Sequence, residues 1–119
     1  MATRTAASVA QANAHARLWK WEGLLNGDVG SSISFPQSTD RSVQVTGTFG
    51  AGGSLNIVGS NDGGTTWAVL TDPQGNALTF TATKIEAISE LPALIRPEVI
   101  AGDGTTDLDV FIFMAGSIP

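Results

Sequence analysis

Apolar and polar residues alternate with a period of two along much of the chain. In Arg41–Phe49, the valines and the phenylalanine fall on one face, while the serine, glutamine and threonines fall on the other. The segment Leu78–Thr83 alternates in the same way between apolar residues and threonine. A period of two is the repeat of a β-strand with one buried face. The pattern therefore predicts an all-β protein.

Turns rich in glycine, asparagine and aspartate separate the predicted strands. Asn61–Gly64 lies between Ser54–Ser60 and Thr65–Thr71, two runs rich in β-branched residues, and indicates a hairpin because its residues tolerate positive φ. Phe49–Gly53 and Thr71–Asn76 are expected to be further turns. The remaining strands are expected at Arg17–Leu25, Ser31–Phe35, Ala93–Ile100 and Asp107–Met114. About eight short strands with frequent turns predict one antiparallel β-sandwich, jelly-roll-like in type.

Two segments fit this pattern less well. Pro97 lies inside the strand expected at Ala93–Ile100. Because proline donates no hydrogen bond to a sheet, it predicts an edge strand or a bulge there. Lys84–Leu91 is ambiguous and is compatible with one helical turn that crosses between the sheets.

The N-terminal segment differs from the rest of the chain. Residues 2–16 contain seven alanines, and Val9 is their only large apolar residue. A segment with so little to pack forms a marginal helix or an arm that becomes ordered on contact with something else. We therefore expect a flexible N-terminal arm at residues 1–16 and a β-sandwich domain at residues 17–119.

Composition narrows the possible functions. The sequence has 119 residues and a mass of 12.3 kDa, the size of one domain. It contains no cysteine, which excludes disulfides and thiolate metal sites. Only 14% of the residues are charged, well below the roughly 25% typical of soluble domains. A surface this poor in charge indicates contact with a partner.

Charge is unevenly distributed along the chain. Residues 1–20 carry three basic residues and no acid, whereas residues 21–119 carry three basic residues against 11 acids. An acidic body does not attract nucleic acid, so we expect no nucleic-acid partner. No apolar run approaches the roughly 18 residues of a membrane span, and the N-terminus lacks a secretory apolar stretch. We expect no membrane partner, and synthesis in the cytoplasm.

Candidate catalytic and metal-binding residues are few. The single histidine, His15, lies in the alanine-rich segment, and the sequence has no nucleophile elbow or phosphate-binding loop. The aspartates of Asp103–Asp109 offer oxygen ligands to calcium, as do Asn61 and Asp62. Their spacing matches no calcium-binding loop, and turn geometry accounts for them. We expect no catalytic residue, no cofactor, no metal site and no enzyme activity.

Two of the predicted strands are apolar on both faces. In Asp107–Met114, the even-numbered residues form one apolar face, while Phe111 and Phe113 lie on the other. In Arg17–Leu25, both tryptophans share a face opposite Leu18 and Leu24. Strands that are apolar on both faces are usually covered on both sides. The cover is either the N-terminal arm or a loop, or else the extra surface is an assembly interface.

The second alternative gives a specific hypothesis for the interaction site. The residues of this candidate inter-subunit surface are Trp19, Trp21, Phe111 and Phe113, together with Arg4 and Val9 of the arm.

Four segments carry a resemblance to known proteins, and they are Val43–Gly50, Gly59–Trp67, Ile95–Pro97 and Gly102–Thr106. Together they resemble small β-sandwich virion proteins of tailed bacteriophages. The resemblance implies a capsid decoration or cement protein, which binds the outer surface of the head and clamps neighbouring capsid subunits. It also implies the major capsid protein as partner, a homo-oligomer (dimer or trimer), and a location on the capsid surface of the virion.

Other functions remain open. The Gly59–Trp67 hairpin is also similar to one in discoidin-type jelly-roll modules that bind sugars or lipids, so a carbohydrate-binding module of a phage tail or fibre is an alternative. Trp67 could offer a face for a sugar, but its spacing with Val69 favours a core or half-buried position. A head-completion or tail structural component is a further alternative.

Overall fold

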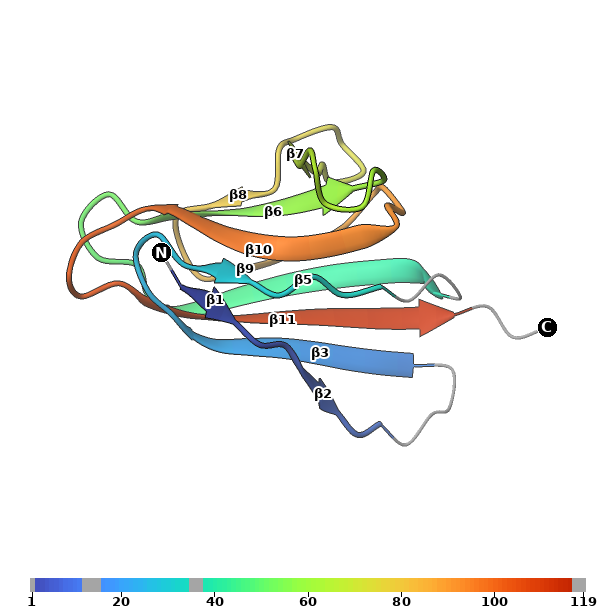
Figure 1. Ribbon diagram of the computed structural model, residues 1–119, viewed down its shortest axis with the longest axis horizontal. Coiled ribbons are helices and arrows are strands. Elements are labelled where there is room, and N and C mark those ends of the chain that lie inside the picture. The colour runs from blue at the N-terminus through green and yellow to red at the C-terminus, as the bar shows by residue number, and fades with distance from the viewer. Residues whose placement is uncertain (1, 12–15, 35–37, 117–119) are drawn as a thin grey trace.

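The computed structural model describes residues 2–11, 16–34 and 38–116. These residues form two β-sheets that pack together (Figure 1), so the predicted all-β sandwich is confirmed. Eleven strands are described instead of about eight, because several are only two residues long. No helix in these ranges is long and apolar enough to cross a membrane. His15 and Phe35 lie outside the described residues.

One sheet has six strands, with β10 at the centre of its order. The strands are β1 (Thr3–Arg4), β4 (Val29–Gly30), β10 (Leu94–Ala101), β6 (Ser54–Ser60), β7 (Ala68–Val69) and β8 (Thr79–Phe80). The order is β1-β4-β10-β6-β7, and β8 also pairs with β6. β1 runs parallel to β4, while the other pairs are antiparallel.

The other sheet has five strands, all antiparallel, with β11 at its centre. The strands, in spatial order, are β2 (Ala7–Val9), β3 (Ala16–Leu24), β11 (Asp107–Gly116), β5 (Ser38–Thr48) and β9 (Lys84–Ala87). The expected helical turn at Lys84–Leu91 is wrong, because the backbone of β9 pairs with β5 and extends the ladder.

The core lies between the two sheets. The even-numbered residues of β11, from Leu108 to Met114, point inward and are fully buried, as their alternation predicted. Other large buried residues include Trp21, Leu24, Val43 and Val45 from the five-stranded sheet, and Leu55, Ile57, Phe80, Ile95 and Val99 from the six-stranded sheet, while Ile33, Leu70, Leu78 and Ile88 join them from the connecting segments.

A bulge in β3 changes the face on which its side chains lie. Leu24 pairs with Leu108, but Trp21 pairs with Val110, so two residues of β3 stand opposite one residue of β11. Gly23 has a φ of 70°, a conformation that a bulge residue needs and that glycine adopts at low cost. Because of this bulge, Leu24 faces the core together with Trp21, and not the opposite side as strict alternation predicted.

Pro97 lies in the middle of a central strand and not at an edge. The amide groups of Ile95 and Val99 bond to carbonyls of the segment 28–33 on the β4 side. Pro97 lies between these two residues in the chain. Its nitrogen has no hydrogen to donate, and the bonds to the β4 side are made by the residues before and after it. Gly30 makes the room, since a Cβ there would lie only 2.7 Å from Cδ of Pro97. The edge-strand alternative is therefore wrong, because a short neighbouring strand accommodates the proline. The bulge alternative has a counterpart nearby, since the register of β10 with β6 shifts between Val99 and Ala101.

The strand expected at Ser31–Phe35 is also displaced. The described pairing begins earlier, at β4, in residues that look like a turn from the sequence. Between β4 and the last described residue of this segment, Ser34, only a single bridge remains, between Ile33 and Ile95. Gly30 packs directly against the Trp21 ring, because a Cβ on Gly30 would lie only 2.6 Å from atoms of that ring. This close contact determines the path of the strand.

Residues 2–9 of the expected arm lie against both sheets of the sandwich. β1 joins the six-stranded sheet and β2 joins the five-stranded sheet (Figure 1). Asp28 holds the start of the segment, accepting hydrogen bonds from Ala2 N at 3.1 Å and Arg4 Nε at 3.2 Å. Ala6 N donates to Ser31 Oγ at 2.8 Å. We call residues 2–9 the N-terminal strap. Hydrogen bonds made by its backbone groups hold it in place, although its lack of large apolar residues did not predict a fixed position.

Candidate assembly surface

The outer face of the five-stranded sheet carries both phenylalanines of the predicted interface. Phe111 and Phe113 alternate with the buried residues of β11 and therefore point away from the core. Phe113 is 37% exposed, and Phe111 is half-buried. Phe113 pairs with Leu18 on one side and Ser42 on the other.

The apolar surface extends to both edges of this sheet. Val9 pairs with Leu18 on the same outer face. On the opposite edge, Ile85 of β9 pairs with Gln44 and is 60% exposed. We define the outer apolar face by its five large residues, which are Val9, Leu18, Ile85, Phe111 and Phe113. No other described element pairs with or covers this face.

Charges on this face are few and partly neutralised. Lys20 forms an ion pair with Glu22 at 2.9 Å. Asp109 accepts a hydrogen bond from Gly23 N at 3.0 Å, in the bulge of β3. A hollow of about 150 Å³ lies beside Phe113, lined also by Asp40, Arg41, Ser42 and Ala115. The face therefore combines two phenylalanines and a hollow with polar neighbours, since Lys20 and Gln44 flank Phe111.

Not all of the predicted interface residues reach this surface. Trp21 is fully buried, and its Nε1 donates to the carbonyl of Ser31 at 3.0 Å, so its assignment to the interface is wrong. Trp19 shares its inward face and packs against the core, half-buried. Arg4 forms an ion pair with Asp28 at 3.2 Å on the N-terminal strap. Both tryptophans therefore lie on the side of β3 that faces the core.

Leu18 and Ile85 belong to the surface but were missed from the sequence. The sequence pattern places Leu18 on the face opposite the tryptophans but does not indicate that Leu18 belongs to an interface. Ile85 was hidden because Lys84–Leu91 was not recognised as a strand. Read as a strand, the alternation of Ile85 with its charged neighbours Lys84 and Glu86 would have indicated an outward position.

The outer face of the six-stranded sheet is covered by its own side chains. The Arg96 guanidinium lies 4.0 Å from the centre of the Trp67 ring. Glu98 holds the same guanidinium at 2.7 Å, and Val58 of this face is buried. Trp67 is half-buried, as predicted, and its Nε1 donates to the carbonyl of Gly64. The exposed large apolar side chains of this sheet are Val69 and Ile100, whereas the five-stranded sheet exposes Ile85 and the aromatic Phe113.

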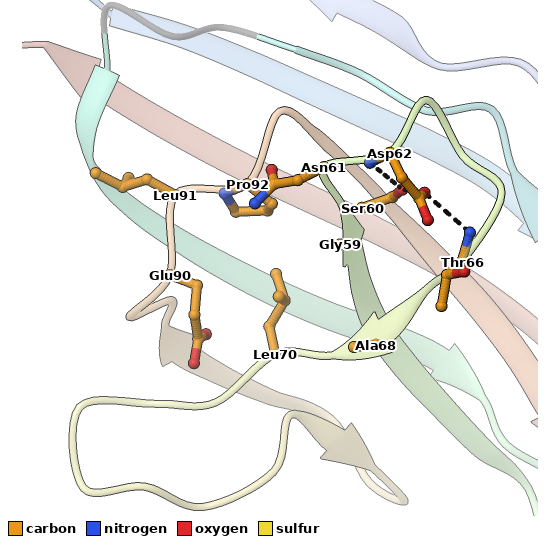
Figure 2. Close-up of a pocket in the computed structure, with 10 residues that line it drawn as sticks. All are labelled: Gly59, Ser60, Asn61, Asp62, Thr66, Ala68, Leu70, Glu90, Leu91 and Pro92. Carbon is orange, nitrogen blue, oxygen red and sulfur yellow. Dashed lines mark hydrogen bonds between the residues drawn. The ribbon is translucent and has the colours of Figure 1, made fainter.

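A groove of about 470 Å³ lies at the end of β6 and β7 (Figure 2). Leu70, Leu91 and Pro92 supply its apolar wall. Its polar residues include Asp62 and Glu90, whose carboxylates accept hydrogen bonds from the protein itself. The groove was not predicted, because its two sides come from segments that are distant in the sequence.

The carboxylate of Asp62 organises the hairpin that borders this groove. It accepts hydrogen bonds from Thr66 N at 2.9 Å and from Ser60 Oγ at 2.7 Å (Figure 2). These bonds stabilise the ionised form and lower the pKa of Asp62 to about 2. Asp103 has a similar role in its own turn, where hydrogen bonds from Thr105 and from the Ala51 amide lower the pKa of Asp103 to about 2. Turn geometry therefore accounts for both acids.

We expect the Asp62 carboxylate to titrate at about pH 2 in the folded protein. Its contribution to hairpin stability is present above the ordinary pKa of 3.8 and is lost as the pH falls toward 2. Ser60→Ala removes one hydrogen bond to the ionised form and should raise this pKa. Carbon-detected NMR titration measures both values. An Asp62 pKa that Ser60→Ala leaves unchanged would contradict this account.

The described ranges contain no group of three or more histidine, cysteine, aspartate or glutamate side chains able to hold a metal ion. Two of the carboxylates of Asp103–Asp109, which could bind calcium by their chemistry, instead accept hydrogen bonds within the protein. Asp103 accepts from the amides of Ala51 and Thr105, and Asp109 accepts from the amide of Gly23.

Comparison with solved structures identifies a similar fold. The chain superposes on the SPBc2 prophage-derived protein YomS with a TM-score of 0.63 and 12% sequence identity, over 91% of this chain and 99% of that one. The two proteins share a fold. At this level of identity the likeness concerns the fold alone.

Two further structures align with lower scores. Peruvianin-I, a cysteine peptidase from Thevetia peruviana latex, gives a TM-score of 0.45 with 16% identity, over 88% of this chain and 53% of that one. NMB1881 from Neisseria meningitidis gives 0.40 with 5% identity, over 93% and 83%. These scores carry no argument about the present chain. No protein-family description matches the sequence, and no curated protein matches it.

Proposed function

We propose that this protein is a structural component of a tailed-phage particle, of the capsid decoration or cement type. In this role it binds the major capsid protein on the outer surface of the head and stabilises contacts between capsid subunits. It acts by binding and not as an enzyme, and it needs no cofactor. The outer apolar face carries the proposal, because a whole sheet face with an aromatic centre is left open to a partner.

The shared fold with a prophage-derived protein supports the phage origin. Each contact need only be modest, because many copies on a symmetric lattice act together. The low share of charged residues, 14%, fits a surface that is mostly covered in the particle.

A carbohydrate-binding function is the second candidate, and the groove of Figure 2 favours it. Sugars bind where a few polar groups stand beside an apolar wall, and Asn61, Asp62 and Glu90 stand beside Leu91 and Pro92. Trp67, the aromatic platform considered from the sequence, already has Arg96 over its ring. A glycan array with the purified protein tests this alternative directly.

The first experiment measures binding of the purified protein to expanded phage heads that lack it. We expect saturable binding at many copies per head. The double variant Phe111→Ser/Phe113→Ser should bind at least roughly tenfold more weakly, because it removes the aromatic centre of the face. Co-sedimentation with heads and quantitative gel analysis give both numbers.

Ile100→Ser is the matched control for this experiment. Ile100 is 53% exposed and lies in β10 of the six-stranded sheet, so it has similar polarity but a different location. It should bind heads like the unaltered protein. A protein that ignores heads, or one whose binding falls equally with Ile100→Ser, would argue against the proposed role of the outer apolar face.

A further inference from the structure

We infer that the groove of Figure 2 receives a basic side chain from an extended segment of a partner protein. The groove borders β6 and β7 of the six-stranded sheet, so this docking site leaves the outer apolar face free. The inference rests on the proposed function only in naming a second capsid subunit as the partner. Three properties of the groove support it, which are its fixed walls, its negative charge and its apolar surface.

Hydrogen bonds hold the two walls of the groove in place. One wall is the hairpin after β6, and the other is the crossover segment from β9 to β10. In the hairpin, Asn61 Oδ1 accepts a hydrogen bond from Ala93 N of the crossover at 2.6 Å. Glu90 accepts one from Thr71 N at 2.8 Å, which fixes the crossover to the segment after β7. The groove is therefore formed before a ligand arrives, and binding costs little ordering of the protein.

Each wall of the groove carries a carboxylate that is held by neutral donors. Asp62 accepts hydrogen bonds from Ser60 Oγ and Thr66 N on the hairpin (Figure 2). On the crossover, Glu90 accepts hydrogen bonds from the amide and the hydroxyl of Thr71. None of the ion pairs formed by the described residues involves either carboxylate, and no lining residue is basic. The groove therefore presents two negative charges without a cation of its own.

Both carboxylates are ionised at neutral pH. Hydrogen bonds from Thr66 and Ser60 lower the pKa of Asp62 to about 2. Burial raises the pKa of Glu90, but the hydrogen bonds from Thr71 outweigh burial and lower this pKa below its usual 4.5. A positively charged group in the groove is therefore attracted to both walls, whereas an anionic ligand is repelled.

The apolar part of the lining fits the stem of a long basic side chain. Leu70, Leu91 and Pro92 form this part, and Leu91 is 54% exposed. Arginine and lysine lay their methylene groups on such surfaces while the charged head stays among polar groups. The ten lining residues include no aromatic ring on which a sugar could stack. A basic side chain therefore fits this lining better than carbohydrate, which remains the competing occupant in the test.

The size and position of the groove favour a protein segment as its occupant. Its volume of about 470 Å³ lies within the roughly 300–1,000 Å³ of ligand pockets, so it accommodates a long side chain with adjoining backbone. The groove and the outer apolar face belong to different sheets. One copy can therefore hold one capsid subunit by its outer apolar face and a neighbouring subunit by the groove, and two modest contacts on one molecule reinforce each other.

NMR titration of the isotope-labelled full chain tests the inference with a defined probe, a blocked alanine–arginine–alanine tripeptide. We expect saturable shifts at the amides of Asp62, Thr66 and Ala93, with millimolar affinity. The same peptide with citrulline, which has nearly the shape of arginine without its charge, should bind roughly fivefold more weakly. High salt should weaken binding of the arginine peptide, because the residues of both carboxylates are exposed.

A double variant tests the two carboxylates directly. Asp62→Asn/Glu90→Gln removes both charges but keeps an acceptor oxygen at each position, and it should weaken the arginine peptide by roughly fivefold. Asp103→Asn/Asp107→Asn is the matched control, because it changes the net charge equally. Asp103 is likewise held in a turn by neutral donors, but it does not line this groove. The control should bind the peptide like the unaltered protein, and circular dichroism establishes that both variants are folded.

The outcomes separate this inference from the proposed function. No shift with the arginine peptide, equal binding of the citrulline peptide, or equal losses in the two double variants overturns the inference. N-acetylglucosamine that binds at the same amides more tightly than the arginine peptide also overturns it, because the occupant is then carbohydrate. In each of these cases, heads bound through Phe111 and Phe113 leave the proposed function standing. Arginine bound in the groove of a protein that ignores heads supports the groove site and removes the decoration role.

Discussion

Replacing Trp21 by alanine should lower the free energy of unfolding by about 3–5 kcal/mol, the usual cost of truncating a fully buried large aromatic residue. Trp21 is completely shielded from solvent in the centre of the core. Its ring packs against Gly30, and its Nε1 donates to the carbonyl of Ser31. Alanine would leave a cavity between the two sheets and a buried carbonyl without its donor. Urea denaturation followed by fluorescence or circular dichroism measures the loss.

Two control variants separate packing from hydrogen bonding at this position. Trp21→Phe keeps most of the apolar volume but removes the donor to Ser31, and should cost less than the alanine variant. Trp67→Ala truncates a half-buried tryptophan under Arg96 and should also cost less. A Trp21→Ala variant as stable as the unaltered protein would show that Trp21 is not in the core.

Replacing Asp28 by alanine should destabilise the protein by about 2–3 kcal/mol, because hydrogen bonds to a buried charged group are lost. This buried carboxylate accepts hydrogen bonds from Ala2 N, Arg4 Nε and Leu25 N, the last at 2.9 Å. It thereby joins the N-terminal strap to the loop before β4. We also expect faster hydrogen exchange at the amides of Val29 and Ser31, which bond to carbonyls of the strap.

The effect of Asp28 should depend on pH. Burial raises its pKa, but the hydrogen bonds from Leu25, Arg4 and Ala2, together with the Arg4 charge, outweigh burial and lower the pKa below 3.8. A lowered pKa stabilises the folded state above pH 3.8, and this contribution disappears as the pH falls through the native value. Arg4→Ala should reproduce part of the effect. Additive losses in the double variant Arg4→Ala/Asp28→Ala would mean that the two residues are not coupled.

Strand alternation was sufficient to predict the sandwich, and the reasons for its failures are physical. β6 has the predicted bounds, and the buried face of β11 is the predicted one. Alternation failed at β3 because one glycine bulge shifts the later side chains to the other face. Alternation held in β10, but the edge strand expected from Pro97 is absent because the neighbouring strand, with Gly30, accommodates a proline in a central position. Local patterns contain no information about the strand that will lie alongside.

The candidate site was predictable only in part. Phe111 and Phe113 were correctly placed on the outer side because their neighbours in the chain are plainly apolar and inward. The sequence prediction places Trp21 in the interface because a single strand does not show which of its two apolar faces packs into the core. Val9 and Ile85 join the phenylalanines only through pairing between strands distant in the sequence. The surface is therefore a property of the sheet order and not of any one segment.

The position of the two central strands has a consequence for biosynthesis. β10 and β11 are the last two of the described strands to be synthesised, yet each lies in the middle of its sheet. Until they emerge from the ribosome, β3 and β5 have no partner between them, and neither do β4 and β6. Val45, for example, must wait for Val110, more than half the chain away. Such distant pairing slows folding, so the nascent chain should remain open, and dependent on protection from aggregation, until its final strands complete both layers together.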